Sequence, residues 1–431
     1  MNTELRNSLG GLRGHQFFSW MLVIGQIIFV LSSYPMMYQG YDIHWLLDSI
    51  RDLSMHENNK WQSVWAVFFE VIGLGESKAL RALVIHRTQS LITFILIGSS
   101  AYLFLDVALK KTDKHLKLQL ASVSVVVWLT MHGTYSSPSG EPHYTARHVL
   151  SWLQWYSVSY QITLPLFFYG CASLLKGVTA DNARLTMKWC LVTLVVAGVI
   201  AIFHAAELVY FLFVASGILF LYVLPNNNWR TSLLVVVLLV ALFILGLNFS
   251  YRKPEVFRLL HPDRWADLSS ILQQYGYRLV ELNLIRSETT WHSMYSGSFL
   301  SASLVVLIGQ GAQRKLSFLV LYSAILAITI HISYVAGFLA LIVGEFVTWR
   351  FGFSSLLYLG FPLLVGAMLE RIRMPIAPFY TSLLAIGALV GILFFCIAYS
   401  FIYEPLQPAF NFAKSLLFSL SPELSYFPSL Q

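Results

Sequence analysis

Long apolar runs recur along almost the whole of this 431-residue chain. A run of roughly 17 to 25 apolar residues can cross the hydrocarbon core of a bilayer as a helix. With 57% hydrophobic and only 11% charged residues, the composition excludes an ordinary soluble domain and a disordered chain. About twelve segments have the required length: residues 17–37, 86–106, 117–134, 148–174, 187–204, 206–224, 231–249, 294–311, 316–333, 334–349, 353–369 and 377–401.

The polarity pattern of these runs decides between the two membrane folds. Backbone groups in lipid must be hydrogen-bonded within the protein, so only helices and closed β-barrels cross a bilayer. Barrel strands alternate in polarity, and no such alternation occurs in this sequence. The sequence therefore predicts an all-α polytopic membrane protein with about 12 transmembrane helices and structured outer-face loops.

The distribution of Lys and Arg predicts the orientation of the spans. Short basic connections at 110–117, 176–188 and 314–315 mark the cytoplasmic side. The N-terminus then lies inside, and the first run stays as an anchor because it is too long for a signal peptide. The segments expected outside are 38–85, 135–147, 250–293 and 370–376.

Residues 1–431 are expected to form a single integral membrane domain. The outer loop 38–85 contains two short amphipathic stretches, which predict interfacial helices at 42–55 and 61–74. The full layout is a first span at 14–37, the outer loop 38–85, six spans in 86–249, a long outer loop 250–293, about five spans in 294–401 and a cytoplasmic tail 402–431.

Some motifs of soluble enzymes are missing. There is no GxxxxGK[ST] phosphate loop and no HExxH, so neither ATP hydrolysis nor a peptidase zinc site is expected. The isoelectric point near 9.2 fits contact with anionic lipid or phosphate. No nucleic-acid partner is expected.

Charge is concentrated in the first outer loop, between Tyr41 and Asp52. Asp42 and Asp48 lie there beside His44 in an otherwise apolar chain. A carboxylate at this place has two interpretations. Asp42 is a candidate general base for an acceptor hydroxyl, or it caps the N-terminus of an interfacial helix.

The segment Tyr38-Gln39-Gly40-Tyr41-Asp42-Ile43-His44-Trp45, together with one span followed by an outer loop of two interfacial helices, resembles the GT-C superfamily of membrane glycosyltransferases. The resemblance covers the layout of roughly the first 220 residues and extends to related surface-polysaccharide polymerases. It implies polyprenyl-phosphate-linked sugars as substrates and Asp42 as catalytic base or metal ligand. Asp42 and Asp48 are not adjacent, as the acidic pair of that family commonly is. No cofactor is therefore expected, and a divalent metal stays an open alternative.

Sugar transfer from a lipid phosphate also needs cations that stabilise the departing phosphate. Candidate substrate-binding residues on the outer side are His44, Asp48, Arg81, His86, Arg87, Glu141, His143, Arg147, His204 and Glu207. Each set has a structural alternative. Arg81, His86 and Arg87 could serve as headgroup anchors at a span end, and His204 with Glu207 could form a tight exposed turn.

The leading hypothesis is a glycosyltransferase or polymerase of the bacterial inner membrane. It would act on undecaprenyl-linked sugars at the outer face, in O-antigen, capsule or exopolysaccharide assembly. Its expected partners are the lipid-linked saccharide, membrane lipid and other polysaccharide-assembly proteins. Two alternatives stay open: a transporter or flippase of a lipid-linked saccharide, which would carry charges at mid-membrane, and a b-type cytochrome with two His at similar depth.

Overall fold

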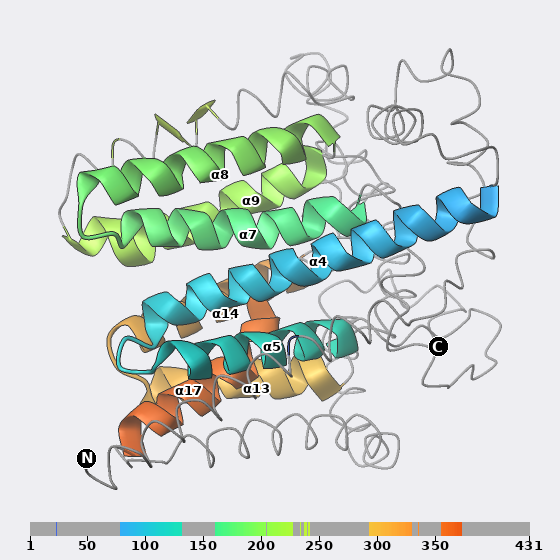
Figure 1. Cartoon of the computed structure of the whole chain (residues 1–431). Helices are drawn as coiled ribbons and strands as arrows, with labels where there is room; N and C mark the ends of the chain where they lie inside the picture. The colour runs from blue at the N-terminus through green and yellow to red at the C-terminus, as the bar shows by residue number, and fades with distance from the viewer. Residues whose placement is uncertain are drawn as a thin grey trace, which may run out of the picture.

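The computed structural model describes residues 78–131, 160–203, 205–226, 293–329 and 355–372, and single positions at 23, 233, 237–238, 240–241 and 335. Helices and short turns account for these segments, with no strand among them, so the all-α class is confirmed for this part of the chain. The helices pack as one bundle (Figure 1). They are α4 (Lys78–Ala108), α5 (Lys114–Met131), α7 (Tyr160–Val178), α8 (Ala183–Phe203), α9 (Ala205–Ile218), α13 (Ser293–Ile308), α14 (Ala312–Thr329) and α17 (Gly360–Ile372).

Two of these helices are long and apolar enough to cross a membrane, through Leu91–Ala108 in α4 and Ala183–Ala201 in α8. Thr163–Val178, Glu207–Val223 and Gly297–Ile308 are apolar but shorter. The described residues thus support two spans by length and composition. The expectation of about twelve extends beyond them.

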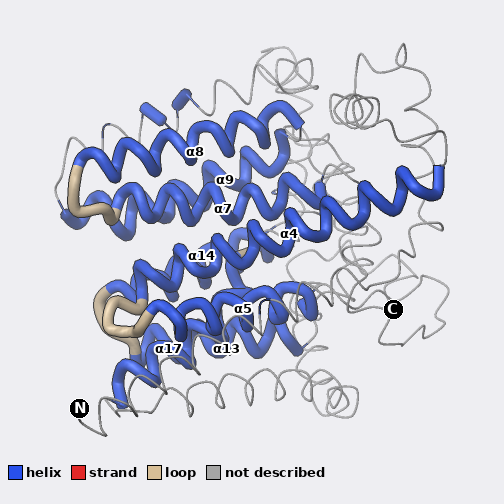
Figure 2. The backbone as a smooth tube through the Cα atoms, in the orientation of Figure 1, coloured by secondary structure: helices blue, strands red, loops and turns tan. Residues whose placement is uncertain are grey.

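Short turns join α4 to α5, α7 to α8 and α13 to α14, and each turn carries its own stop or start signal. The Asp113 carboxylate accepts a hydrogen bond from the backbone N–H of His115 at 2.8 Å and so caps α5. Asn182 caps α8 in the same way, through the N–H of Leu185 at 2.8 Å. Gly311 has a φ of 48°, a conformation that glycine adopts without steric penalty. The turns lie at one end of the bundle (Figure 2).

Basic side chains gather at this end, which we call the basic end. They include the Lys and Arg residues of the connections 110–117, 176–188 and 314–315, which the sequence predicts on one side of the membrane. The three turns therefore share one end of the bundle. The carboxylates at the same end are Asp106, Asp113, Asp181 and Glu370. The Lys and Arg residues that the structure describes at the basic end are Lys110, Lys111, Lys114, Lys117, Lys176, Arg184, Lys188, Arg314, Lys315 and Arg371.

Asp106, near the C-terminal end of α4, joins three helices at the basic end. Its carboxylate is 2.7 Å from Nζ of Lys117 on α5 and also forms an ion pair with Lys176 on α7. The Lys117 side chain is only 7% exposed and that of Asp106 27%. A carboxylate at a helix C-terminus opposes the helix dipole, so the two lysines compensate an otherwise unfavourable position.

Glu370, in the last turn of α17, forms the second junction. Its Oε1 accepts hydrogen bonds from the backbone N–H groups of Lys111 and Thr112, at 2.8 and 2.9 Å. Its Oε2 accepts from Nε2 of Gln313 on α14 at 2.7 Å. The expectation that 370–376 lies on the side opposite to the basic connections is therefore wrong for Glu370, and residues 373–376 lie outside the described part of the chain. Glu370 contacts those connections directly.

Within the expected span at 353–369, the described part begins at Ser355, inside the bundle. The backbone N–H of Leu356 donates to Oγ of Ser323 at 2.9 Å, so the 3₁₀ turn Leu356–Leu359 starts beside the middle of α14. Ser323 and Gln313 are about 15 Å apart along the axis of α14. That is roughly half of a hydrocarbon core of about 30 Å.

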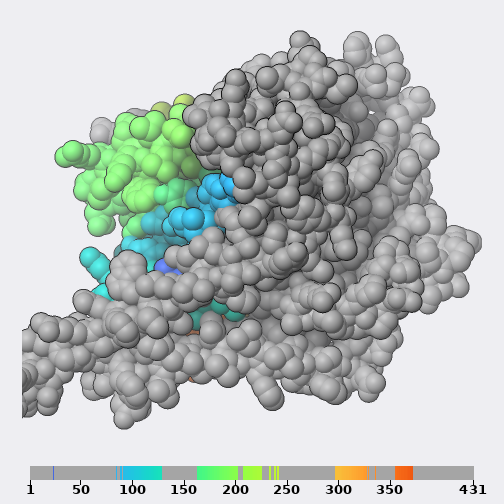
Figure 3. Space-filling model, turned by 45° about the vertical axis from the view of Figure 1, so that its right-hand side comes forward, coloured from blue at the N-terminus to red at the C-terminus, as the bar shows by residue number. Residues whose placement is uncertain are grey.

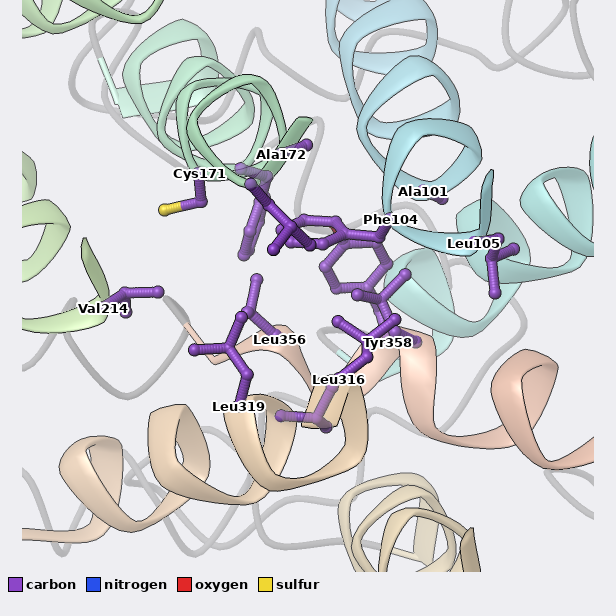
Figure 4. Packing of buried hydrophobic residues seen from close by; sticks show 14 of the residues in the cluster. Ala101, Phe104, Leu105, Cys171, Ala172, Val214, Leu316, Leu319, Leu356 and Tyr358 are labelled. Atoms are coloured by element: carbon purple, nitrogen blue, oxygen red, sulfur yellow. The ribbon is translucent and has the colours of Figure 1, made fainter. Parts of the chain in front are cut away.

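The core lies where this 3₁₀ turn enters the bundle. Tyr358 is fully buried, and its ring lies 4.9 Å from that of Phe168 on α7 in an edge-on contact. Its hydroxyl shares a hydrogen bond of 2.9 Å with Oγ of Ser100 on α4. Figure 4 shows Leu356 and Tyr358 between the side chains of α4 and α7 and those of α14. The 3₁₀ turn Leu356–Leu359 thus fills the centre of the bundle.

We expect Asp106→Asn to destabilise the bundle, because it leaves Lys117 nearly buried without a counter-charge. Loss of one member of a buried pair costs about 3–5 kcal/mol, and the partial exposure of Asp106 reduces this to roughly 2 kcal/mol. Thermal unfolding of the purified protein measures the effect. Asp181→Asn, an exposed carboxylate at the same end, is the matched control, and equal melting temperatures for the two variants would refute the role of Asp106.

The position of α17 predicts which residues share one side of a membrane. Single cysteines at Asp181, Gln310 and Arg371, all exposed at the basic end, should react with an impermeant maleimide from the same side of sealed vesicles. The background is a variant without the three natural cysteines. A cysteine at Asn58, in the loop expected on the other side, provides the contrast. Labelling of position 371 together with position 58 would contradict the fold.

Candidate functional site

The end of the bundle opposite the basic end contains the described part of the expected site. α4 starts there and runs towards the basic end, and α8 ends there before α9 turns back. α4 is the longest of these helices at 31 residues, so its first turns extend past its neighbours (Figure 1). Arg81, His86 and Arg87 lie in this N-terminal part of α4.

The helical register of α4 places positions 81 and 86 on different sides of the helix. With 3.6 residues per turn, position 86 shares a face with Gln89 and Thr93, which are 0% and 1% exposed. Position 81 instead lies in line with Ile95, which is 51% exposed. By register alone, position 86 is in line with the buried residues of α4 and position 81 with the exposed ones.

Glu207 is the candidate carboxylate within the described part of this end. It lies in the first turn of α9 and is only 2% exposed. The expectation of an exposed hairpin turn is therefore wrong for this residue. A carboxylate in the first turn is stabilised by the helix dipole, which is a structural reason for its presence.

Other buried polar groups occupy the same half of the bundle. Thr163 on α7 is 1% exposed, and its helix packs between α4 and α9. By helical rise, Gln89 on α4 and Glu207 on α9 are each about 28 Å from the basic end. The face of α4 that carries Gln89, the start of α7 and the start of α9 thus bring neutral polar groups and one carboxylate to this end. Such groups can bind hydroxyls.

The carboxylates at the basic end are committed to structure. Glu370 uses both oxygens on the α4–α5 turn and on Gln313, and Asp106 is held between two lysines. Neither is a candidate acid or base. Within the described residues, no group of three or more His, Cys, Asp or Glu is placed to hold a metal ion.

Four of these residues were not among the candidates predicted from the sequence: Gln89, Thr163, Asp106 and Glu370. The sequence position of Asp106 did indicate a structural role. An acidic residue at the C-terminal end of an apolar run opposes the helix dipole, so a nearby cation is expected. The position of Gln89 was informative too, since it follows His86 by three residues on one helix face. The remaining predicted residues, which are Asp42, His44, Asp48, Glu141, His143, Arg147 and His204, lie outside the described residues.

Comparison with known proteins adds no family to this description. No protein-family model matches the chain, and no curated protein sequence matches it significantly.

Proposed function

We propose that the chain is a membrane glycosyltransferase or polysaccharide polymerase that uses lipid-linked sugars, with its site at the end opposite the basic end. Asp42 is the proposed base, and Glu207 with the inward face of α4 contributes to the sugar-binding surface. With the basic end in the cytoplasm, this site faces the outer side of the inner membrane. Undecaprenyl-linked saccharides are the proposed substrates.

The observation that supports this proposal is the distribution of charge along the bundle. Within the described helices, every Lys, Arg, Asp and Glu lies towards one of the two ends, and the central turns carry none. Reaction of a lipid-linked sugar takes place at the membrane surface, where its phosphate is located. Ionisable groups at an end of the bundle suit that reaction, because a carboxylate there can accept a proton from a hydroxyl.

One feature favours a transporter or flippase as the second candidate. The 3₁₀ turn Leu356–Leu359 and α17 form a broken, half-crossing element that starts inside the bundle. Transporters place such elements at their central substrate sites. In this chain, however, Leu356, Leu357, Tyr358 and Leu359 are all at most 3% exposed. The start of the element is filled by apolar side chains, so we rank sugar transfer first.

Asp42→Asn should abolish transfer at unchanged protein level, because an amide cannot take the proton of the acceptor hydroxyl. We expect a rate loss of at least about 100-fold, the typical contribution of a general base. A deletion strain that carries either form at matched membrane abundance is compared by polysaccharide gel ladder and sugar analysis. Asp52→Asn is the control in the same loop. A normal ladder from Asp42→Asn would rule out this base.

Glu207→Gln and Glu370→Gln form a second, matched comparison of buried or bonded carboxylates at the two ends. Glu207→Gln should lower the turnover rate by roughly 10-fold or more with little change in melting temperature, if Glu207 contacts the sugar or its acceptor. Glu370→Gln should lower the melting temperature, because an amide in place of the carboxylate loses part of the junction with Lys111, Thr112 and Gln313, and leave specific activity unchanged. The reverse pattern would assign Glu207 to structure alone.

A further inference from the structure

α8 presents a one-sided surface that sugar transfer does not use. At 3.6 residues per turn, Arg184, Lys188, Leu191 and Val195 fall within one narrow arc of the helix. All four side chains are exposed, Leu191 and Val195 each by 59%. α8 lies at the edge of the bundle (Figure 1), and Figure 3 shows the green region that contains α7 and α8 uncovered on one side.

The two cations on this arc differ from the lysines inside the bundle. Lys117 and Lys176 are neutralised by Asp106, whereas neither Arg184 nor Lys188 forms an ion pair within the described part of the chain. Lys188 contacts a π-system instead, with its Nζ 5.8 Å from the ring centroid of Trp189. The two cations are one helical turn apart, and together they can bind one anionic group from two sides.

The whole arc, cations included, has about the length of one membrane leaflet. From Arg184 to Val195 the arc extends about 16 Å, close to half of a hydrocarbon core of about 30 Å. Gly198 continues the same arc, and a side chain at this position would meet no atom within 4 Å. The opposite face of α8 is the packed one, through Thr193, Ala197 and Ile200, which are 0% exposed.

We propose that this face of α8 binds an anionic phospholipid from the leaflet at the basic end. The phosphate is bound by Arg184 and Lys188, and an acyl chain lies along Leu191 and Val195. A soluble phosphate would use the cations but leave the apolar arc uncovered, so the lipid is the better fit. The inference rests on the membrane placement in the proposed function and not on sugar transfer.

Phosphatidylglycerol and phosphatidylcholine are titrated into the purified full-length protein in neutral detergent, with melting temperature and native mass spectrometry as readouts. Phosphatidylglycerol should stabilise the protein at lower concentration than phosphatidylcholine. Arg184→Gln with Lys188→Gln should raise the half-saturating phosphatidylglycerol concentration roughly 30-fold, from the usual contribution of two cations near an anionic surface. The charge-keeping swap Arg184→Lys with Lys188→Arg should retain binding.

Lys110→Gln with Lys111→Gln is the matched control, because it removes the same charge from the basic end without an apolar arc above it. If both double glutamine variants lose lipid binding equally, the effect is general charge attraction, and the proposed lipid site on α8 is wrong. Stabilisation by glycerol 3-phosphate alone would also overturn it, in favour of free phosphate. Retained lipid binding without any sugar transfer would contradict the proposed enzyme only, whereas a chain that stays in solution without detergent would refute the membrane placement itself.

Discussion

Two carboxylates determine how the described helices meet. Apolar side chains give little preference for one neighbour over another inside lipid, because the lipid is itself apolar, and polar contacts between helices then select the partners. Asp106 selects α5 and α7 as neighbours of α4 through Lys117 and Lys176. Glu370 selects the α4–α5 turn and α14 as neighbours of α17. The shared end of the hairpins follows from these two junctions.

The same logic explains how a non-helical start is tolerated in the interior. An unpaired backbone group in an apolar interior is strongly unfavourable, and Ser355 at this start has an extended conformation with a ψ of 146°. Ser323 supplies the missing partner, since its Oγ accepts from the N–H of Leu356, while Tyr210 donates to the carbonyl of Ser323. Neutral hydroxyls therefore hold the centre, and charges hold the basic end.

The apolar pattern was sufficient to predict much of the described helix order. The runs 117–134 and 187–204 correspond to α5 and α8, with bounds that differ by a few residues. The pattern does not determine how the run 353–369 lies in the bundle, because an apolar run of spanning length has the same composition whether it crosses the bilayer or packs against other helices halfway. Only a long-range contact, such as that of Glu370 with Thr112, distinguishes the two.

The candidate site could likewise be predicted from the sequence only in part. Glu207 stood out in the sequence as a charge inside an apolar stretch. The buried face of α4 became visible only when Gln89 and Thr93 were found buried, because an apolar helix shows no polar side that would reveal which face packs. Periodicity of hydrophobicity is informative at a water boundary and weak between lipid and protein.

The position of Glu370 also constrains the rest of the topology. If the chain crosses the membrane an odd number of times after Glu370, its C-terminal tail cannot lie at the basic end. The expectation of a cytoplasmic tail at 402–431 took the segment 370–376 to lie on the outer side. Residues 377–431 lie outside the described part of the chain, but the contacts of Glu370 with the α4–α5 turn remove that premise.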